Sequence, residues 1–466
     1  MAKIHLSLLG CDKNRIDAEI MAKKLVDAGH VLSEDPSKSD LVLVNTCGFI
    51  EAAKKESIDV IFDMARLKED KKSQTSALVI AGCLAERYRE KLAQLIPEAD
   101  AVVGIGRNGD ITDIVKKALS GQRTLSFDLP EKLPLEGSRL LSTSRHYAYL
   151  KIAEGCSNRC TYCAIPSIRG HFRSRKPQDI ISEARRLAAG GAKELILVAQ
   201  DTTAYGKDLS GKATLSSLLR EMAQIDELWK IRVLYAYPDN ITDELIDTMS
   251  GEKKIARYLD IPLQHANGEV LRHMGRAGNK ETLLALVRRL REGIPGIVLR
   301  SSFIVGFPGE TKARFLDLLD FQEAALIDRA GCFAYSAEEG TPAFRLRNSV
   351  PQREKEERLE IFMRRQTDIL GEKQRLRQGA VLETVTEGFD GQKGLCVART
   401  EYDAPEIDTV VYFKTKNEPE IGAMVKVRIT RSDSYDLYGD EIGVEESMTG
   451  GEKPIAPCSV DDICAK

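Results

Sequence analysis

Glu154-Gly-Cys-Ser-Asn-Arg-Cys-Thr-Tyr-Cys-Ala-Ile-Pro166 is the most informative stretch of this chain and decides its fold. Its cysteines Cys156, Cys160 and Cys163, here called the core triplet, have the spacing C-x3-C-x2-C. Thiolates are the soft ligands that iron–sulfur clusters require, and a short loop can place three of them on one 4Fe–4S cube. The fourth iron would lack a protein ligand and could bind a substrate or cofactor. The alternatives are unrelated buried thiols and a zinc site, but zinc prefers four ligands, and no fourth Cys or His is obvious beside the loop.

A second set of cysteines follows apolar strands in the first hundred residues. Cys11, Cys47 and Cys83, here called the N-terminal triplet, are 36 residues apart in both steps. An amphipathic helical stretch follows each one, which predicts a doubly wound parallel α/β sheet with the cysteines at its carboxyl edge. Cysteines merely tolerated in three turns are the alternative. Three in the same structural place favour a second 4Fe–4S cluster, again with one open iron. The expected strands and helices are Ile4–Leu9, Leu41–Val44, Leu78–Ala81, Ile16–Ala28, Glu51–Leu67 and Glu86–Leu95.

Strands and helices also alternate between residues 146 and 335. Six strand–helix units are too few for a closed eight-stranded barrel, so an open partial (β/α)6 barrel is predicted, with its active site at the carboxyl ends of the strands. The expected strands are Tyr147–Ile152, Glu194–Ala199, Ile231–Tyr235, Tyr258–Ile261, Ile297–Phe303 and Gly331–Tyr335. The expected helices are Pro177–Ala189, Leu215–Gln224, Asp243–Met249, Lys280–Arg291 and Lys312–Ala325.

Residues at or just past these strand ends are candidates for contacts with a cofactor or substrate. They are Gln200, Ser302 and Gly306, the last because glycine lets the backbone approach a ligand closely. The plain alternatives are helix caps at Asp201 and Thr311, a satisfied histidine at His265 and a salt bridge at Arg300.

The C-terminal part has a different texture. Gln352–Arg377 has the pattern of a charged connecting helix, and short alternating strands follow it from Val381 onward. Five such strands predict a small antiparallel barrel of the OB kind. The range 381–446 holds fifteen acidic and seven basic residues, whereas an RNA-binding barrel would need positive charge to offset phosphate. The acidic balance therefore favours a basic protein partner.

Composition and charge agree with a cytoplasmic protein. Charged residues are nearly balanced, with a formal net charge of -3, so nothing global indicates nucleic acid. No apolar run approaches the length of a membrane span, and the first residues lack a secretory h-region, so no membrane association is expected. Ten cysteines in 466 residues make no disulfide framework. Nothing suggests an obligate assembly, so a monomer is expected.

These motifs together resemble the radical S-adenosylmethionine (SAM) methylthiotransferase family along nearly the whole chain. In radical SAM enzymes the open iron chelates SAM, and the aromatic residue before the third cysteine, here Tyr162, lies near the adenine. The C-terminal barrel corresponds to the family's TRAM domain. The resemblance and the sequence pattern together divide the chain into five ranges: an N-terminal methylthiotransferase domain with an iron–sulfur cluster (1–125), a linker poor in regular pattern (126–145), a radical SAM core with the connecting helix (146–372), a TRAM domain (373–446) and a flexible tail outside the resemblance (447–466).

Two branches of the family compete for this sequence. The MiaB type modifies an adenosine of tRNA, and the RimO type modifies an aspartate β-carbon in small-subunit ribosomal protein twelve. The sequence resembles the RimO type in Gly10-Cys-Asp-Lys-Asn-Arg15, Asn45-Thr-Cys-Gly-Phe-Ile50, Gly82-Cys-Leu-Ala-Glu-Arg-Tyr88, Gly170-His-Phe-Arg-Ser-Arg175, Leu197-Val-Ala-Gln-Asp-Thr-Thr203 and Leu259-Asp-Ile-Pro-Leu-Gln-His265.

The resemblance also implies the chemistry. One SAM would be cleaved reductively at the core-triplet cluster, and the radical formed would remove hydrogen from the aspartate β-carbon. The N-terminal cluster would deliver a CH3–S group made with a second SAM. An electron donor such as flavodoxin or ferredoxin is implied, nucleic acid is not expected as substrate, and no catalytic residue is expected beyond the cluster ligands.

Overall fold

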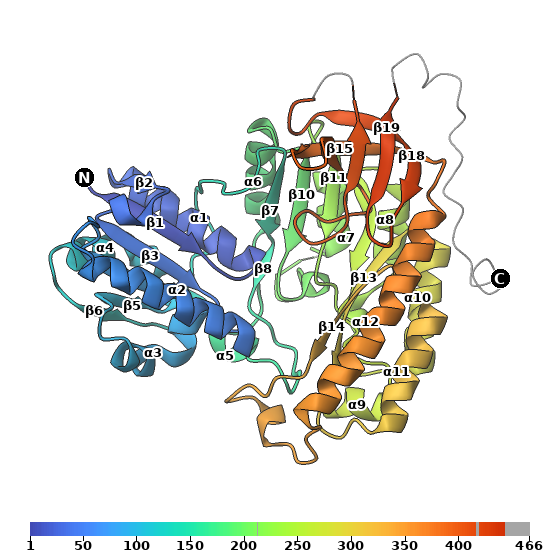
Figure 1. Ribbon diagram of the computed structural model, residues 1–466, viewed down its shortest axis with the longest axis horizontal. Coiled ribbons are helices and arrows are strands. Elements are labelled where there is room, and N and C mark those ends of the chain that lie inside the picture. The colour runs from blue at the N-terminus through green and yellow to red at the C-terminus, as the bar shows by residue number, and fades with distance from the viewer. Residues whose placement is uncertain (212, 416–418, 443–466) are drawn as a thin grey trace.

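The structure is a computed structural model that describes residues 1–211, 213–415 and 419–442. An N-terminal α/β domain lies beside a half-barrel of strands and helices, and a small β-barrel packs against that half-barrel (Figure 1). The expected tail and residues 443–446 of the expected TRAM range lie outside the described residues.

The N-terminal domain is built on a parallel sheet in the order β2-β1-β3-β4-β5-β6. Helices α1 and α4 cover one face, and α2 and α3 cover the other, as predicted for a doubly wound sheet. The strands are β1 (Lys3–Leu8), β2 (Val31–Ser33), β3 (Leu41–Thr46), β4 (Ala77–Gly82), β5 (Ala101–Val103) and β6 (Thr124–Ser126). The helices are α1 (Asp12–Asp27), α2 (Glu51–Glu69), α3 (Cys83–Leu95) and α4 (Ile111–Leu119).

The strand order explains where a ligand would bind in this domain. Successive connections run to opposite sides of β1, so the topological switch lies between β1 and β3. Ligands of open α/β sheets bind outside the carboxyl ends of the strands at such a point. Cys11 follows β1, Cys47 follows β3, and Cys83 follows the neighbouring β4. The N-terminal triplet therefore stands at the switch point.

The half-barrel has the parallel order β7-β10-β11-β12-β13-β14, and its sheet is open. Its strands are β7 (Tyr147–Lys151), β10 (Glu194–Val198), β11 (Lys230–Val233), β12 (Ile255–Asp260), β13 (Val298–Val305) and β14 (Arg329–Ala334). Its long helices are α6 (Pro177–Ala189), α7 (Leu215–Met222), α8 (Asp243–Gly251), α10 (Lys280–Gly293) and α11 (Lys312–Ala325). The predicted partial (β/α)6 barrel is thus confirmed.

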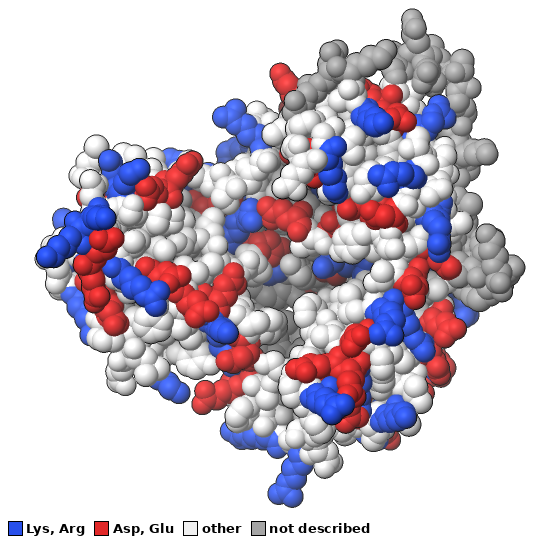
Figure 2. All heavy atoms as spheres, in the orientation of Figure 1, with Lys and Arg blue, Asp and Glu red and all other residues white. Residues whose placement is uncertain are grey.

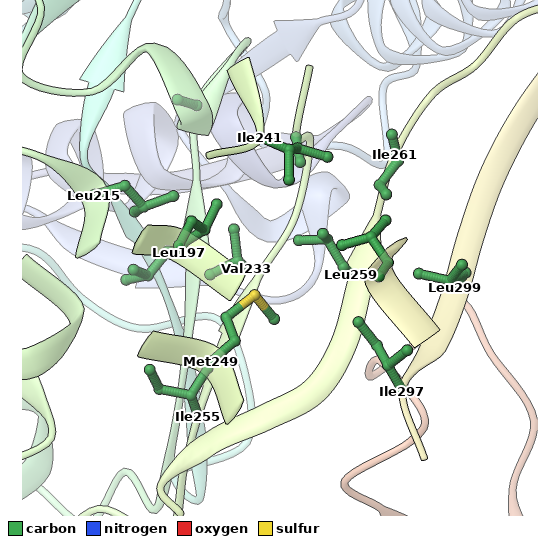
Figure 3. Packing of buried hydrophobic residues seen from close by; sticks show 14 of the residues in the cluster. Leu197, Leu215, Val233, Ile241, Met249, Ile255, Leu259, Ile261, Ile297 and Leu299 are labelled. Atoms are coloured by element: carbon green, nitrogen blue, oxygen red, sulfur yellow. The ribbon is translucent and has the colours of Figure 1, made fainter. Parts of the chain in front are cut away.

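The outer face of the half-barrel forms the largest core. Side chains alternate between the two faces of a strand, so every second residue faces the helices. Figure 3 shows Leu197, Val233 and Leu259 from neighbouring strands packed with Leu215 and Met249 from the helices. At about 25 cal/mol per Å² of buried apolar surface, this layer supplies much of the driving force for folding.

The inner face of the half-barrel is covered by the other two domains. Tyr147, Ile196 and Tyr258 point inward and share a buried cluster with Phe413 of the small barrel and Ile16 of α1. A half-barrel leaves this apolar inner face without further strands to cover it, so the flanking domains bury it instead. The position of α1, which follows Cys11, is fixed by this contact.

The small C-terminal barrel is closed in the order β15-β16-β17-β19-β18. Within the described residues its neighbouring strands run antiparallel, as predicted, except that β17 and β19 run parallel. Helix α12 (Gln352–Arg375) leads into it. Buried ion pairs fix it to the half-barrel, with Arg399 2.6 Å from Glu194 and Arg329 2.6 Å from Asp403. The strands are β15 (Val381–Asp390), β16 (Leu395–Thr400), β17 (Val411–Lys414), β18 (Met424–Ser432) and β19 (Leu437–Glu441).

The expected linker is an irregular segment that is held in place by charge. The side chain of Arg139 is buried, and its guanidinium lies 2.8 Å from both Glu19 of α1 and Glu183 of α6. Figure 2 shows side chains of both signs mixed over the visible face, with a hollow between the N-terminal domain and the half-barrel. No helix in the described ranges is long and apolar enough to cross a membrane.

Candidate functional site: two cysteine triplets

The core triplet lies in a loop that begins at the carboxyl end of the first half-barrel strand. The short strand β8 (Ala153–Glu154), paired with β9 (Arg173–Ser174), leads into it, and helix α5 (Ile165–Arg169) follows Cys163. The backbone fixes both sides of the loop, because the Cys156 N–H donates to Gly170 O at 3.1 Å and the Thr161 N–H donates to Met274 O at 2.9 Å. The loop is therefore ordered by the barrel around it.

The thiols of the core triplet are close enough to affect one another. Burial, together with the charge of Cys160, raises the pKa of Cys156 to about 11 and that of Cys163 to about 12. Such thiols are protonated at neutral pH, so metal binding must release their protons. Arg276 donates to the Cys160 sulfur at 3.7 Å and stacks over Tyr237 at 4.4 Å. Its positive charge acts to lower the pKa of the neighbouring Cys163 and so favours the thiolate form that a cluster needs.

The N-terminal triplet is brought together by close approach of three strand ends. A side chain on Gly10 would lie 2.8 Å from the Cys47 Cβ, and one on Gly48 would lie 2.7 Å from the Leu84 backbone. Gly82 has φ +95°, and a side chain there would lie 2.5 Å from Thr46 O. Only glycine allows such spacing. The sequence Gly-Cys or Cys-Gly at each strand end is the local cause of the convergence.

The environment of the N-terminal triplet differs from one cysteine to the next. Cys11 is exposed, whereas Cys47 and Cys83 are buried. Burial raises the pKa of Cys83 to about 12, a net value in which the charge of Arg169 acts to lower the pKa and the charges of Cys11 and Cys47 act to raise it. Asn14 contacts the Cys83 thiol at 3.9 Å and donates to Leu9 O at 2.6 Å and to Thr46 O at 3.1 Å. Its amide ties the ends of β1 and β3.

The donor set of each triplet fits a 4Fe–4S cube with one open iron. The six cysteines of the two triplets are thiols, and each triplet offers three of them within mutual electrostatic reach. No three His, Cys, Asp or Glu side chains in the described ranges lie close enough to hold a single metal ion. A cube takes each thiolate at a different corner, so its ligands are spread more widely than those of one ion.

Two of the predicted SAM contacts lie beside the core triplet. Tyr162 packs edge-on against Phe307, with ring centroids 6.5 Å apart, so the loop after β13 supports its ring. Gln200 follows β10 and donates its amide Nε2 to Glu154 Oε1 at 2.6 Å. Its Oε1 is buried without a partner among the described residues, and such an acceptor suits a cationic ligand group. Both roles stay predictions.

The other two predicted contacts have different surroundings. Ser302 is half-buried on β13 in the same alternation as Arg300, which lies 3.8 Å from Asp260 and 3.6 Å from Asp408. Arg300 therefore forms the salt bridges that were its alternative role. Gly306 has φ +72°, donates its N–H to Glu310 at 2.7 Å, and faces Lys355 of α12. Its N–H is thus already used, and its role in SAM binding stays a prediction.

The remaining polar candidates have local structural roles. Asp201 caps a short 3-10 helix by accepting from the Ala204 N–H at 3.1 Å, and Thr311 caps α11 by accepting from the Arg314 N–H at 3.3 Å. His265 is fully buried and accepts from the Asn267 N–H at 2.9 Å. The caps at Asp201 and Thr311 agree with their plain alternatives. His265 is satisfied at one ring nitrogen only, because its Nε2 is buried without a hydrogen-bond partner among the described residues.

A buried charge network joins the two triplets and was missed from the sequence. Arg169, at the end of α5, donates to the Cys83 sulfur at 3.4 Å and to Asp17 and Glu154 at 2.9 Å each. Lys151 donates to Asp17 and, at 2.7 Å, to Glu154. Asn14 and Arg276 were also missed. The sequence showed only polar residues near each triplet, and the contacts of Arg169 and Lys151 with the other domain span 86 to 155 residues.

Comparison with known proteins agrees with this architecture. Residues 3–104 match the model of uncharacterized protein family UPF0004, residues 150–321 match the radical SAM superfamily, and residues 379–442 match the TRAM domain. The radical SAM methyltransferase TsrM from Kitasatospora setae, solved with cobalamin and a [4Fe-4S] cluster, superposes with a TM-score of 0.54 at 17% identity over 73% of this chain and 76% of that one. That likeness shows a shared fold.

The half-barrel and its cysteine loop define the chain as a radical SAM enzyme, which implies a 4Fe–4S cluster and SAM as cofactors. Ribosomal protein uS12 methylthiotransferase RimO of Clostridium tetani is 44% identical over 94% of this chain and 98% of its own length. The RimO protein of Desulforamulus reducens is 46% identical over 94% and 99%. The chain belongs to the RimO family of radical SAM methylthiotransferases.

Proposed function

We propose that this chain transfers a CH3–S group to the β-carbon of an aspartate in ribosomal protein uS12. The observation that carries the proposal is the pair of cysteine triplets, one at each carboxyl edge of two parallel sheets and joined through buried contacts. An enzyme that only cleaves SAM needs one such site. The relatives that match nearly the full length are named for this modification of uS12.

The core triplet would hold the cluster at which SAM binds. Cluster and SAM together, when bound, supply the radical chemistry that removes a hydrogen atom from an unactivated carbon. The chain's own part is to orient and to exclude water. Tyr162 offers a ring face beside the loop, and Gln200 offers an unpartnered carbonyl oxygen beside Glu154. Ser302 and Gly306 complete the proposed SAM contacts.

The N-terminal triplet would hold a second 4Fe–4S cluster, the source of the methylthio group. Its position at the switch point of an open α/β sheet supports this proposal, since that is where such sheets bind ligands. The Gly-Cys and Cys-Gly strand ends bring its thiols together. Two clusters, one in each domain, would then face the same substrate carbon.

The partner of the C-terminal barrel would be the basic ribosomal protein. The range 381–446 carries fifteen acidic and seven basic residues, and opposite charge steers association and selects the partner. We also propose a cytoplasmic monomer that receives its electron from a flavodoxin or ferredoxin.

The test uses anaerobically reconstituted, reduced protein with SAM. Ribosomal protein uS12 and, separately, an unmodified tRNA anticodon arm would be offered, and each analysed by mass spectrometry. A gain of one methylthio group on an aspartate of uS12 alone is expected. Modification of the RNA alone would show that the chain acts instead as a tRNA adenosine methylthiotransferase of the MiaB type.

A further inference from the structure

One short helix connects the two cysteine triplets. Helix α5 begins two residues after Cys163 and ends at Arg169, whose side chain reaches Cys83 of the other domain. Ala164 and Ile168 pack against Cys83 in a small buried cluster of their own. The third cysteine of one triplet is therefore joined to the third cysteine of the other by a five-residue helix.

Arg169 makes a set of contacts that hold its guanidinium on the sulfur. It is 1% exposed, and its Nη2 donates to the Cys83 sulfur at 3.4 Å and to Asn14 Oδ1 at 3.4 Å. Its Nη1 donates at 2.9 Å to both Asp17 and Glu154. Asp17 belongs to α1 of the N-terminal domain and Glu154 to β8 of the half-barrel. Carboxylates from both domains thus fix a planar, permanently charged donor.

We infer that Arg169 is a positioning residue for the N-terminal cluster. It donates a charged hydrogen bond to the Cys83 ligand and thereby raises the reduction potential of the cluster. The inference rests on the proposed second cluster. Hydrogen bonds to cysteine sulfurs and local net charge set the potentials of iron–sulfur clusters. Reduction adds one electron to the cluster, and the buried cation stabilises the extra negative charge.

The same contacts make the tuning depend on how the domains fit together. Arg169 comes from the half-barrel, whereas its sulfur acceptor lies in the N-terminal domain. Glu154, which holds the guanidinium, also accepts from Gln200 at 2.6 Å. One chain of hydrogen bonds therefore runs from the proposed SAM site to the N-terminal cluster through Arg169.

The test measures the potential of the N-terminal cluster alone. The core triplet is replaced by alanine in the full chain so that a single cluster remains, and anaerobic dithionite, the electron source, is titrated while the reduced cluster is followed by electron paramagnetic resonance. Arg169→Gln in this background is expected to lower the equilibrium constant for one-electron reduction about tenfold, that is about 59 mV to more negative potential. Arg169→Lys keeps the charge and is expected to recover most of the shift.

A charge-balanced double variant and a matched control distinguish a specific effect on the cluster from general misfolding. Arg169→Gln leaves Asp17 with one cation fewer, so Asp17→Asn with Arg169→Gln restores the local net charge. The double variant still lacks the hydrogen bond to Cys83 and is expected to show a smaller shift in the same direction. Arg329→Gln removes another buried guanidinium, which lies 2.6 Å from Asp403 at the opposite end of the half-barrel strands. It is expected to leave the potential unchanged.

The outcomes separate this inference from the proposed function. If Arg169→Gln, alone and together with Asp17→Asn, binds iron with an unchanged potential, the inference is overturned and the second cluster is unaffected. An equal shift in Arg329→Gln overturns it too, because general destabilisation would then be the cause. No iron in the parent with the core triplet replaced overturns the second cluster and the inference together.

Discussion

The two cysteine triplets differ in how the chain assembles them. The core triplet spans eight residues of one loop, whereas the N-terminal triplet spans 73 residues and three strand ends. Closing the longer segment costs about 2 kcal/mol more, since each doubling of a loop costs about 0.6 kcal/mol. The packing of the folded sheet offsets this entropic cost. Local sequence therefore places the core ligands near one another, whereas the packing of a whole domain brings the N-terminal ligands together.

Removing each triplet in turn gives the largest expected effect. With the core triplet replaced by alanine, both reductive cleavage of SAM and modification of uS12 should fall to background, because the site of SAM binding is lost. With the N-terminal triplet replaced, cleavage of SAM should persist while methylthiolation disappears. Chromatography of 5′-deoxyadenosine and mass spectrometry of uS12 measure the two activities. Methylthiolation that survives loss of Cys11, Cys47 and Cys83 would contradict a role for the second cluster.

A glycine substitution should disturb the N-terminal triplet without changing its cysteines. Gly82→Ala forces a side chain to φ +95° and to 2.5 Å from Thr46 O, so the N-terminal domain should lose about 2 to 4 kcal/mol of stability. The reconstituted protein should then hold about half of its iron, because the core cluster remains. Chemical denaturation and iron analysis measure these effects.

Gly29→Ala is the matched control for that prediction. Gly29 has φ +85°, yet a side chain there would meet nothing within 4 Å. It should cost only about 1 kcal/mol and leave the iron content unchanged. Equal iron loss in both variants would mean that strain alone, rather than the close approach of the strand ends, disturbs the site.

The two triplets also show how far the sequence alone can predict this site. The core triplet lies within one loop, so its spacing could be recognised in the sequence without knowledge of the fold. The N-terminal triplet could be predicted because a strand–helix repeat brings Cys11, Cys47 and Cys83 to one sheet edge, and the parallel order confirms that sheet. Strand boundaries shifted by up to three residues, as for β12, which begins at Ile255.

What the sequence could not predict are contacts that only tertiary structure creates. Arg169 looks like an ordinary residue at the end of a loop, and its partner Asp17 is 152 residues away. Likewise Gly306 follows a strand end, but whether its open side faces a cofactor or α12 depends on where a helix 46 to 69 residues later packs. A charge pairing or a glycine orientation has no periodic signature, so neither can be read before the domains are placed.

A pH-dependent contact at the open edge of the half-barrel should have a smaller effect. Glu338 follows β14, is buried, and lies 2.9 Å from both Lys54 and Arg87 of the N-terminal domain. Burial raises the pKa of Glu338, but hydrogen bonds from the two cations lower it more, so the net shift is downward. A carboxyl with a depressed folded pKa stabilises the protein above its unfolded pKa, and this contribution is lost as pH falls through the folded pKa.

Glu338→Gln should therefore destabilise the protein by about 1 to 3 kcal/mol near neutral pH and by progressively less below about pH 4. Denaturation midpoints of both proteins between about pH 3 and pH 7 measure the difference. Glu51→Gln is the control, because Glu51 also pairs with Lys54 at 2.7 Å but is exposed, and it should cost less than about 0.5 kcal/mol. A difference independent of pH would show that Glu338 acts through packing instead of its charge.

Gln200→Ala should have the smallest effect, and it tests whether Gln200 contacts SAM at the core site. Gln200 donates to Glu154 at 2.6 Å, and its buried Oε1 lacks a partner among the described residues. If that oxygen accepts from SAM, its removal should weaken SAM binding about tenfold, that is about 1.4 kcal/mol. Gln366→Ala removes another buried glutamine, which donates to Ile327 O at 2.9 Å just before the amino end of β14, and should lower stability while leaving SAM affinity unchanged. Equilibrium binding of SAM to the reconstituted proteins measures both. Unchanged affinity in Gln200→Ala would mean that Gln200 only orients Glu154 and the charge network behind it.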